Sequence, residues 1–263
     1  MTQLPFEKYE GLGNDFAVVE TTGDGGMSAA VAIRLCDRHF GIGADGILQV
    51  TLPGGDGADA RMVVWNADGS RPEMCGNGLR CVAAYLARKA RPGPSRVVVE
   101  TDAGPRICDV DGLTITVDMG VAQVDQPVTV RSGDTDLRLA RVSMGNPHVV
   151  AFGAFSRADL AVHGPTLATH PAFPGGTNVE LCTLLPDGSI EVLVWERGVG
   201  PTLACGSGAC AVAVHACVEG LAPFDEPLNV RLPGGVLVVT VAHGLGVRLR
   251  GPARRVFWGT VET

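Results

Sequence analysis

The sequence contains an internal repeat whose two copies lie 130 residues apart, about half of the 263-residue chain. Each copy has an apolar run that ends in tryptophan, at Trp65 or Trp195. Ten residues after each tryptophan comes a Cys-Gly-x-Gly segment, which begins at Cys75 or Cys205. Self-similarity on this scale predicts that the chain folds as two copies of one domain.

The pattern within each half predicts a β-rich domain around a helix. The 36 glycines and 17 prolines divide the chain into short segments, and β-branched runs between turn residues are typical of strands. These runs are Val97–Glu100, Leu113–Asp118, Val128–Arg131, Leu137–Val142, Ile190–Glu196, Val236–Val241 and Val247–Arg250. Apolar spacing predicts helices over residues 28–39, 75–90 and 205–219, of which the last is apolar nearly all round and should be buried.

Composition narrows the class of protein. Hydrophobic residues make up 46% of the chain, which predicts a sizeable core, and the formal net charge is −7. Basic residues do not cluster, so nucleic acid and acidic membranes are not expected as partners. The amino terminus has no basic and apolar signal-peptide pattern, and no segment is long and apolar enough to span a membrane. We therefore expect a cytoplasmic protein.

The eight cysteines include no Cys-x-x-Cys pair and no pair beside histidines at zinc-finger spacing. A chain of this size without a secretion signal should keep its thiols reduced, so neither a disulfide framework nor a metal site is expected. Most of these thiols should be small buried side chains.

Each Cys-Gly-x-Gly segment places a cysteine between a strand and the amino terminus of a helix. The uncovered amides and the helix dipole there favour an anion such as a substrate carboxylate. The same field should lower the pKa of the thiol. Two such turns in register with a domain repeat suit the inversion of a carbon acid, in which a thiolate removes a proton from one face and a thiol donates one to the other.

A pyridoxal cofactor is not expected. Racemisation through pyridoxal needs a buried lysine for the Schiff base, whereas this chain has only Lys8 and Lys89. Lys8 lies in an amino-terminal strand and Lys89 in the cationic end of a helix, and neither is expected to be buried.

Six motifs, in order along nearly the whole chain, resemble those of the diaminopimelate epimerase family. They are Gly11-Leu12-Gly13-Asn14-Asp15-Phe16, Asn66-Ala67-Asp68-Gly69-Ser70, Met74-Cys75-Gly76-Asn77-Gly78, Met144-Gly145-Asn146-Pro147-His148, Glu196-Arg197-Gly198 and Ala204-Cys205-Gly206-Ser207-Gly208.

The resemblance implies an α+β fold of two pseudo-symmetric, β-barrel-like domains, each wrapped around a central helix. Residues 1–118 would form the first domain together with a returning strand at 252–263, and residues 119–251 would form the second. It also implies a homodimer and the cofactor-free interconversion of LL- and meso-diaminopimelate, in lysine and peptidoglycan precursor biosynthesis.

The resemblance also assigns the site residues. Cys75 and Cys205 would be the acid–base pair, and His148 would help to set their protonation. Arg197 would bind the distal carboxylate of the substrate and Glu196 its distal ammonium group. The remaining predicted substrate-binding residues, some through their backbone amides, are Asn14, Asn66, Gly76, Asn77, Asn146, Asn178, Gly206 and Ser207.

Two departures from the common pattern bear on affinity more than on chemistry. Gly46 stands where some family members carry a glutamine, and Pro201 stands where glutamate is frequent.

Two alternatives remain open. One is a two-thiol racemase for another amino acid, although a substrate without a distal group would leave Glu196 and Arg197 buried and unpaired, which favours diaminopimelate. The other is a thiol redox protein, in which Cys75 and Cys205 would cycle between thiols and a disulfide.

Overall fold

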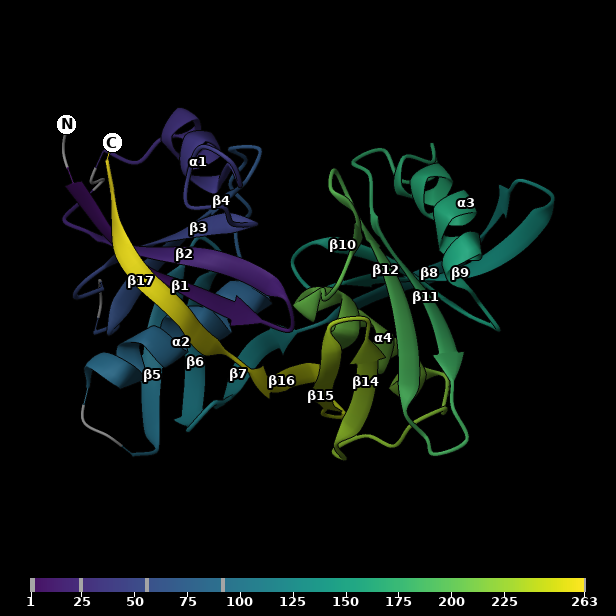
Figure 1. The fold of residues 1–263 in the computed structure, drawn as a ribbon. Coiled ribbons are helices and arrows are strands. Elements are labelled where there is room, and N and C mark those ends of the chain that lie inside the picture. Colours follow the sequence, from purple (N-terminus) through teal and green to yellow (C-terminus); the bar gives the residue numbers. More distant parts are fainter. Residues whose placement is uncertain (1–2, 24–25, 55–56, 91–92, 263) are drawn as a thin grey trace. The chain divides into compact units, whose positions relative to one another are not determined.

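The chain divides into two compact units, each built from a sheet and two helices (Figure 1). The computed structural model describes residues 3–23, 26–54, 57–90 and 93–262. Unit 1 comprises Met1–Asp118 and Gly251–Thr263, and unit 2 comprises Met119–Arg250.

The elements of unit 1 are β1 (Gln3–Gly11), β2 (Asn14–Thr21), α1 (Ala29–Cys36), β3 (Gly46–Thr51), β4 (Ala60–Asn66), α2 (Gly76–Lys89), β5 (Ser95–Thr101), β6 (Gly104–Asp111), β7 (Thr114–Val121) and β17 (Arg254–Glu262). Those of unit 2 are β8 (Gln123–Ser132), β9 (Thr135–Ser143), β10 (Pro147–Phe152), α3 (Arg157–Ala168), β11 (Asn178–Leu184), β12 (Ile190–Glu196), β13 (Gly200–Thr202), α4 (Gly206–Val218), β14 (Leu228–Leu232), β15 (Gly235–Val241) and β16 (Gly246–Pro252).

Strand pairing follows the same course in the two units. In unit 1, β1 and β2 are antiparallel, β2 and β3 parallel, β3 and β4 antiparallel, and β4 and β5 parallel. In unit 2 the same sequence of pairings joins β9, β10, β11, β12 and β14. The strand pairing therefore confirms the repeat, and β13 is an addition to the second copy.

The last strand of the chain completes unit 1. Strand β17 pairs antiparallel with β1, from Gln3 opposite Glu262 to Glu10 opposite Arg254. In unit 2 the corresponding strand is β8, which pairs antiparallel with β9. One unit thus takes this strand from the end of the chain and the other takes it from its own beginning.

A buried helix lies at the centre of each unit, as predicted. Helix α2 contacts β1, β2, β5, β6 and β17, and all of its residues from Gly76 to Ala83 are buried. Helix α4 contacts β9, β10, β11, β14 and β15, and its residues from Gly208 to Val214 are all buried. The burial of apolar surface against these helices is the main stabilising contribution in each core.

Helices α1 and α3 cover a second core in their units. Apolar residues of α1 pack with β2 and β3 around Leu35 and Ile47. Those of α3 pack with β10 and β11 around Leu167 and Val149. The α+β fold with two sheet-and-helix domains is therefore confirmed.

Helix α3 is absent from the sequence-based prediction, which named only the other three helices. It contains Gly164 and Pro165, both unfavourable inside helices. It begins with a capping box in which Ser156 and Asp159 bind each other's backbone amides. Gly164 is required by packing, because a Cβ there would lie 2.8 Å from the ring of Trp195.

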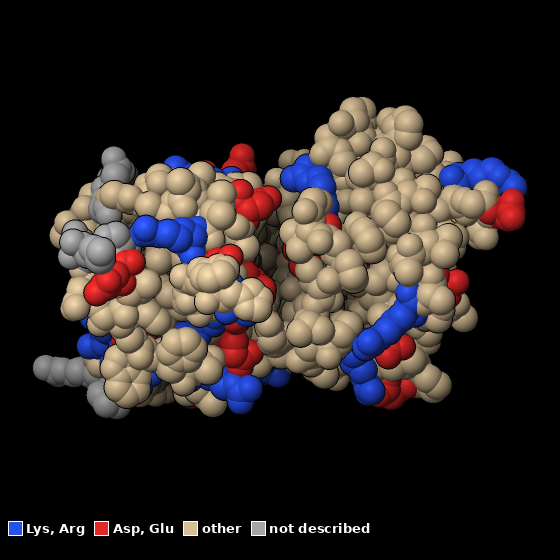
Figure 2. Space-filling model, turned by 45° about the horizontal axis from the view of Figure 1, so that its top comes forward, with Lys and Arg blue, Asp and Glu red and all other residues tan. Residues whose placement is uncertain are grey.

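Charges of both signs are interspersed on the face of the molecule in Figure 2, which shows no extended patch of one sign. Among the described residues, no helix is long and apolar enough to cross a membrane.

Candidate active site

In unit 1, Cys75 caps the amino terminus of α2 with its side chain. Its backbone is extended (φ −138°, ψ 113°), and Sγ accepts a hydrogen bond from the N–H of Gly78 at 3.4 Å. Gly78 allows this close approach, because a Cβ there would lie 2.8 Å from a methyl group of Leu48. The amides of Gly76 and Asn77 precede the first intrahelical hydrogen bond, which Leu79 donates to the Cys75 carbonyl, so they have the position of an anion site.

In unit 2, Cys205 caps α4 in the same way. Its backbone is extended (φ −121°, ψ 113°), and Sγ accepts from the N–H of Gly208 at 3.3 Å. The amides of Gly206 and Ser207 again precede the first intrahelical hydrogen bond. The two repeats therefore build one local structure twice, as the sequence predicted.

The two cysteines differ in their surroundings. Cys75 is half-buried, whereas Cys205 is only 6% exposed. Burial raises the pKa of the Cys205 thiol well above its usual value, and the nearby carboxylates of Glu196 and Glu180 raise it further. Hydrogen bonds from Ser207 and from the Gly208 amide lower it, but they are outweighed. The expectation that the helix terminus lowers the thiol pKa is therefore wrong for Cys205, because burial dominates and keeps the thiol protonated at neutral pH.

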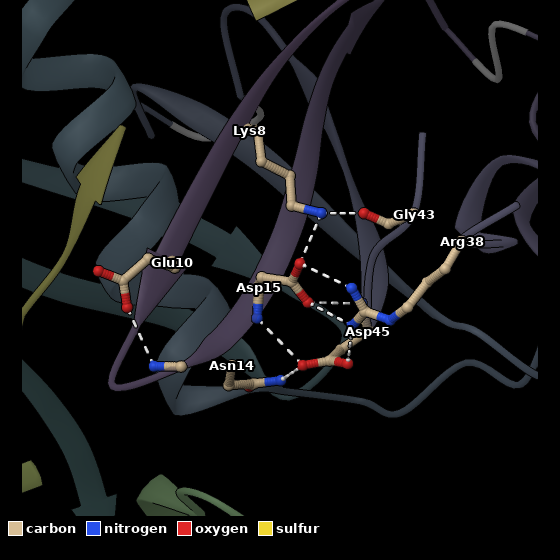
Figure 3. A network of polar contacts seen from close by, with 8 residues as sticks. Lys8, Glu10, Asn14, Asp15, Arg38, Gly43 and Asp45 are labelled. Carbon is tan, nitrogen blue, oxygen red and sulfur yellow. Dashed lines mark hydrogen bonds and ion pairs between the residues drawn. The ribbon is translucent and has the colours of Figure 1, made fainter. Parts of the chain in front are cut away.

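Asn14, a predicted substrate-binding residue, lies beside the Cys75 turn. Its Oδ1 accepts a hydrogen bond from the Asn77 side chain at 3.0 Å, and its Nδ2 donates to Asp45 at 2.9 Å. Figure 3 shows Asp45 in contact with Arg38 and with the Asp15 backbone. The sequence analysis did not single out Asp45, which fixes the orientation of the Asn14 amide.

Asn66 occupies the turn after β4. Its Nδ2 donates to the Ser70 hydroxyl at 2.9 Å. The next residue, Ala67, donates its N–H to the carbonyl of Asp45 at 3.1 Å. The backbone therefore ties the Asn66 turn to the segment that orients Asn14.

Gly46 follows Asp45 at the start of β3, and its position explains the first departure from the family pattern. A Cβ on Gly46 would lie 2.7 Å from the Trp65 carbonyl oxygen and 3.2 Å from the ring of Phe16. The backbone here leaves no room for a side chain.

Lys8 is buried, contrary to the sequence-based expectation. Its Nζ lies 2.6 Å from Asp15 and also donates to the carbonyl of Gly43 (Figure 3). An ion pair with a carboxylate explains why a lysine is stable in this position.

The polar residues of unit 2 form a chain of hydrogen bonds that reaches Cys205. Glu180 contacts His148 at 2.7 Å, and His148 contacts Asn146 at 3.1 Å. Asn146 donates to the Ser207 hydroxyl at 3.3 Å, and this hydroxyl lies 3.5 Å from Cys205 Sγ. The structure thus connects three predicted site residues, His148, Asn146 and Ser207, to Cys205. It adds Glu180, which could have been recognised in the sequence as an acidic residue inside the apolar run 179–182.

Asn178 fixes the backbone around the Glu196-Arg197 segment. Its Oδ1 accepts from the Arg197 N–H at 2.9 Å, and its Nδ2 donates to the Pro147 carbonyl at 3.0 Å. A direct contact of this side chain with substrate stays a prediction.

Glu196 and Arg197 are not the buried, unpaired groups that the comparison of substrates assumed. Glu196 is half-buried and accepts a hydrogen bond from the Thr202 hydroxyl at 2.6 Å. Arg197 is exposed and donates to the Gly175 carbonyl at 2.8 Å. The preference for diaminopimelate over other amino acids therefore cannot rest on their burial.

The described residues contain no group of three or more histidine, cysteine, aspartate or glutamate side chains arranged to hold a metal ion.

The fold is that of amino-acid racemases and epimerases. The chain superposes on a probable proline racemase from Agrobacterium radiobacter K84 with a TM-score of 0.78, at 15% identity over 98% of this chain and 93% of that one. A hydroxyproline epimerase from Agrobacterium vitis gives a TM-score of 0.77, at 15% identity over 99% and 91% of the two chains. A PhzF-family phenazine biosynthesis protein from Bacillus anthracis gives 0.79, at 16% identity over the whole of both chains.

Sequence similarity identifies the family within this fold. The family model described as diaminopimelate epimerase matches residues 6–124 and 140–256. A diaminopimelate epimerase from Desulforudis audaxviator is 45% identical over 97% of this chain and 98% of its own length. Another from a Synechococcus strain is 42% identical over 98% of each. The chain belongs to the diaminopimelate epimerase family and is an epimerase.

Proposed function

We propose that this protein interconverts LL- and meso-diaminopimelate without a cofactor, in lysine and peptidoglycan precursor biosynthesis. The observation that carries the proposal is the duplicated turn, in which Cys75 and Cys205 cap equivalent helices in a member of this family. A reaction that inverts one carbon needs two proton carriers of matched chemistry, and the repeat supplies two thiols.

In the proposed mechanism the two thiols act on opposite faces of the α-carbon. Cys75 removes the α-proton as a thiolate, and Cys205 donates a proton as a thiol, in keeping with its raised pKa. In the reverse reaction the roles exchange. The amides of Gly76 and Asn77 and those of Gly206 and Ser207 would stabilise the negative charge that develops on the α-carboxylate.

The other predicted substrate contacts are also proposals. Asn14, Asn66, Asn146 and Asn178 would bind the substrate. Arg197 is exposed and keeps donors available for a distal carboxylate. Glu196, held by Thr202, would accept the distal ammonium group.

The experiment that tests the function is proton NMR of the reduced protein with LL-diaminopimelate in D2O, without added pyridoxal phosphate. We expect loss of the α-proton signal together with formation of the meso isomer. If neither occurs while the thiols are reduced, the substrate assignment fails, and a panel of other amino acids would then identify a related racemase. A protein that is inert towards all of them would favour the redox alternative.

Replacing either site cysteine should abolish epimerisation. Cys75→Ala and Cys205→Ala each remove the proton carrier for one face, so turnover should fall by at least about a thousandfold. Cys81→Ala is the matched control, because Cys81 is a fully buried thiol on α2 that faces the core, and its turnover should stay largely intact. Near-normal turnover in either site variant would contradict the two-thiol mechanism.

We also propose that the protein is a cytoplasmic homodimer. The eight cysteines all lie in the described parts of the chain and carry thiols rather than disulfides, as the mechanism requires in a reducing compartment. For the dimer, strand β17 exposes Val256, Phe257 and Trp258 at 57%, 43% and 68%. It begins with Arg254 and Arg255 and ends with Glu262, so an antiparallel second copy would place basic against acidic residues.

A further inference from the structure

Glu180 is a carboxylate in the core of unit 2 that the proposed mechanism does not use. It lies on β11 with a side chain that is 0% exposed, and its Oε1 lies 2.7 Å from His148 Nδ1. Its Oε2 is buried and has no hydrogen-bond partner among the described residues. Burying a carboxylate with one oxygen unsatisfied opposes folding, so the residue needs an explanation other than stability.

Comparison with unit 1 shows that the fold does not need polar residues at the positions of His148 and Glu180. The parallel strands β2 and β3 pair Phe16 with Gly46, and β10 and β11 pair His148 with Asn178. Two residues further along the second strand of each pair lie Leu48 in unit 1 and Glu180 in unit 2.

The second glycine of each Cys-Gly-x-Gly segment confirms the equivalence of Leu48 and Glu180. A Cβ on Gly78 would meet Leu48 at 2.8 Å, and a Cβ on Gly208 would meet Glu180 Oε1 at 2.6 Å. Phe16 and Leu48 are both buried apolar residues. The same architecture is thus built with Phe16 and Leu48 in unit 1 and with His148 and Glu180 in unit 2.

The contacts of His148 define its protonation. Nδ1 faces a carboxylate oxygen of Glu180, and Nε2 faces the Oδ1 of Asn146, whose Nδ2 donates to Ser207. Both partners are acceptors, so these contacts suit a ring that donates from both nitrogens, an imidazolium. The Glu180 carboxylate would match the charge of such a ring, and it also lies against the positive end of the α4 dipole at Gly208.

This arrangement gives the hydrogen bonds one direction. The imidazolium donates to Asn146, Asn146 donates to the Ser207 oxygen, and the Ser207 hydroxyl is left to donate to Cys205 Sγ. A sulfur atom that receives a hydrogen bond is stabilised as a thiolate. The carboxylates that act on Cys205 are Glu196 from β12 and Glu180 from β11, and His148 from β10 contacts Glu180.

We propose that Glu180 is a positioning residue for Cys205: by holding His148 as an imidazolium it directs the Asn146–Ser207 hydrogen bonds towards Sγ and stabilises the thiolate formed when Cys205 gives up its proton. The proposal rests on the proposed function of Cys205. The proton passes between Cys205 and the substrate α-carbon, while His148, Asn146 and Ser207 keep their protons and Glu180 stays ionised throughout.

Glu180→Gln should reverse the direction of the hydrogen bonds that run from His148 through Asn146 and Ser207 to Cys205. A glutamine at this position holds a neutral imidazole whose Nε2 is an acceptor, so the Asn146 amide turns to donate to it. The Ser207 hydroxyl then donates to Asn146 and no longer to Cys205. Loss of the carboxylate is accompanied by loss of the imidazolium, so the net charge near Cys205 is unchanged and the effect reports the hydrogen bond.

The first measurement is the protonation of His148 in the wild-type protein by proton–nitrogen NMR, assigned with His148→Gln. We expect both ring nitrogens to be protonated at pH 8, where an ordinary histidine is neutral. A neutral ring at pH 7 would overturn the proposal. This readout does not depend on turnover, so it separates failure of the inference from failure of the proposed function.

The second measurement is the kinetic pH profile of Glu180→Gln. We expect kcat to fall about tenfold with KM within about twofold of wild type, and the alkaline limb of kcat/KM to move up by about one pH unit. The matched control is Glu191→Gln, an exposed glutamate on the neighbouring strand β12, which should keep the wild-type profile. An unchanged kcat and profile in Glu180→Gln would overturn the proposal.

A third variant distinguishes the loss of the positioning role from a failure to fold. The double substitution His148→Phe with Glu180→Leu copies the residues of unit 1, so its circular dichroism and melting should show a folded protein. We expect its kcat to fall at least as far as that of Glu180→Gln. Wild-type turnover in the folded double variant would overturn the proposal.

Discussion

Uncharged side chains hold the charged groups of the site in place. The Thr202 hydroxyl donates to Glu196 at 2.6 Å, and the Asn178 side chain accepts from the backbone of Arg197 at 2.9 Å. A charged side chain with a fixed orientation loses less conformational entropy when it binds a ligand. The polar partners therefore affect affinity although they need not touch the substrate.

Thr202→Val should weaken substrate binding. Valine has nearly the shape of threonine but cannot donate to Glu196, and a lost hydrogen bond to a charged group corresponds to roughly 1–2 kcal/mol. We expect KM for diaminopimelate to rise about three- to tenfold in steady-state assays, with kcat within about twofold. Thr202→Ser keeps the hydroxyl and should behave as wild type. An unchanged KM in Thr202→Val would mean that Glu196 does not bind the distal group.

A cluster of ion pairs fastens the β1–β2 hairpin to the loop between α1 and β3. Asp15 on β2 accepts from Lys8 on β1 and from Arg38 in the loop, and Arg38 also pairs with Asp45. Burial alone would raise the pKa of Asp15, but the hydrogen bonds from Arg38 and Lys8 outweigh it and lower the pKa to about 2. The ionised carboxylate is therefore part of the folded structure.

Because of Asp15, the free energy of unfolding should fall as the pH is lowered. Its folded-state pKa lies below the ordinary value of 3.8, so its contribution is complete above that value and is lost as the pH falls towards 2. Because Arg38 is largely exposed and its charge is screened, we expect a loss on the order of 1 kcal/mol. Denaturant unfolding at pH 6 and pH 3 would measure it. Asp15→Asn should be less stable at pH 6 and show a smaller fall, and an equal fall in both proteins would contradict the assignment.

Secondary-structure elements could be predicted where neighbouring residues in the sequence determine them. The helices capped by Cys75 and Cys205 follow from glycines at a strand–helix junction, and the burial of α4 follows from its nearly all-round apolar surface. Helix α3 could not be predicted from periodicity, because it contains Gly164, which packs against Trp195, and Pro165.

Contacts between distant residues could not be predicted. The burial of Lys8 depends on Asp15 and Gly43, and the role of Glu180 depends on a strand pairing that places it against Gly208. The prediction that the pKa of the Cys205 thiol is lowered was wrong for the same reason. Burial raises this pKa, and burial is a property of the folded unit and not of the turn.

Strand β17 exposes apolar side chains at the surface of unit 1, at Val256, Phe257 and Trp258. On β17 the Trp258 side chain is 68% exposed and is stacked only by Arg255, whose guanidinium lies 4.8 Å from the ring centre among the described contacts. Exposed aromatic residues on a strand are a common feature of interfaces between identical subunits.

Trp258→Glu should separate the proposed dimer. Two copies would bring a carboxylate against its symmetry mate in an apolar contact, which opposes association. Light scattering after gel filtration should give about twice 27.2 kDa for the wild type and 27.2 kDa for the variant. Val236→Glu, an exposed apolar residue on β15 of unit 2, is the control and should remain dimeric. A monomeric wild type at tens of micromolar would contradict the proposal.

The pairing of β17 with β1 has a consequence for the order in which the protein is made. The strands of unit 2 are all translated by Pro252, whereas β1, which is translated before them, is paired only with β2 until Arg254–Glu262 are made. All strands of unit 2 are therefore available for folding before the strand that completes unit 1. The half that carries Cys75 is begun first and finished last.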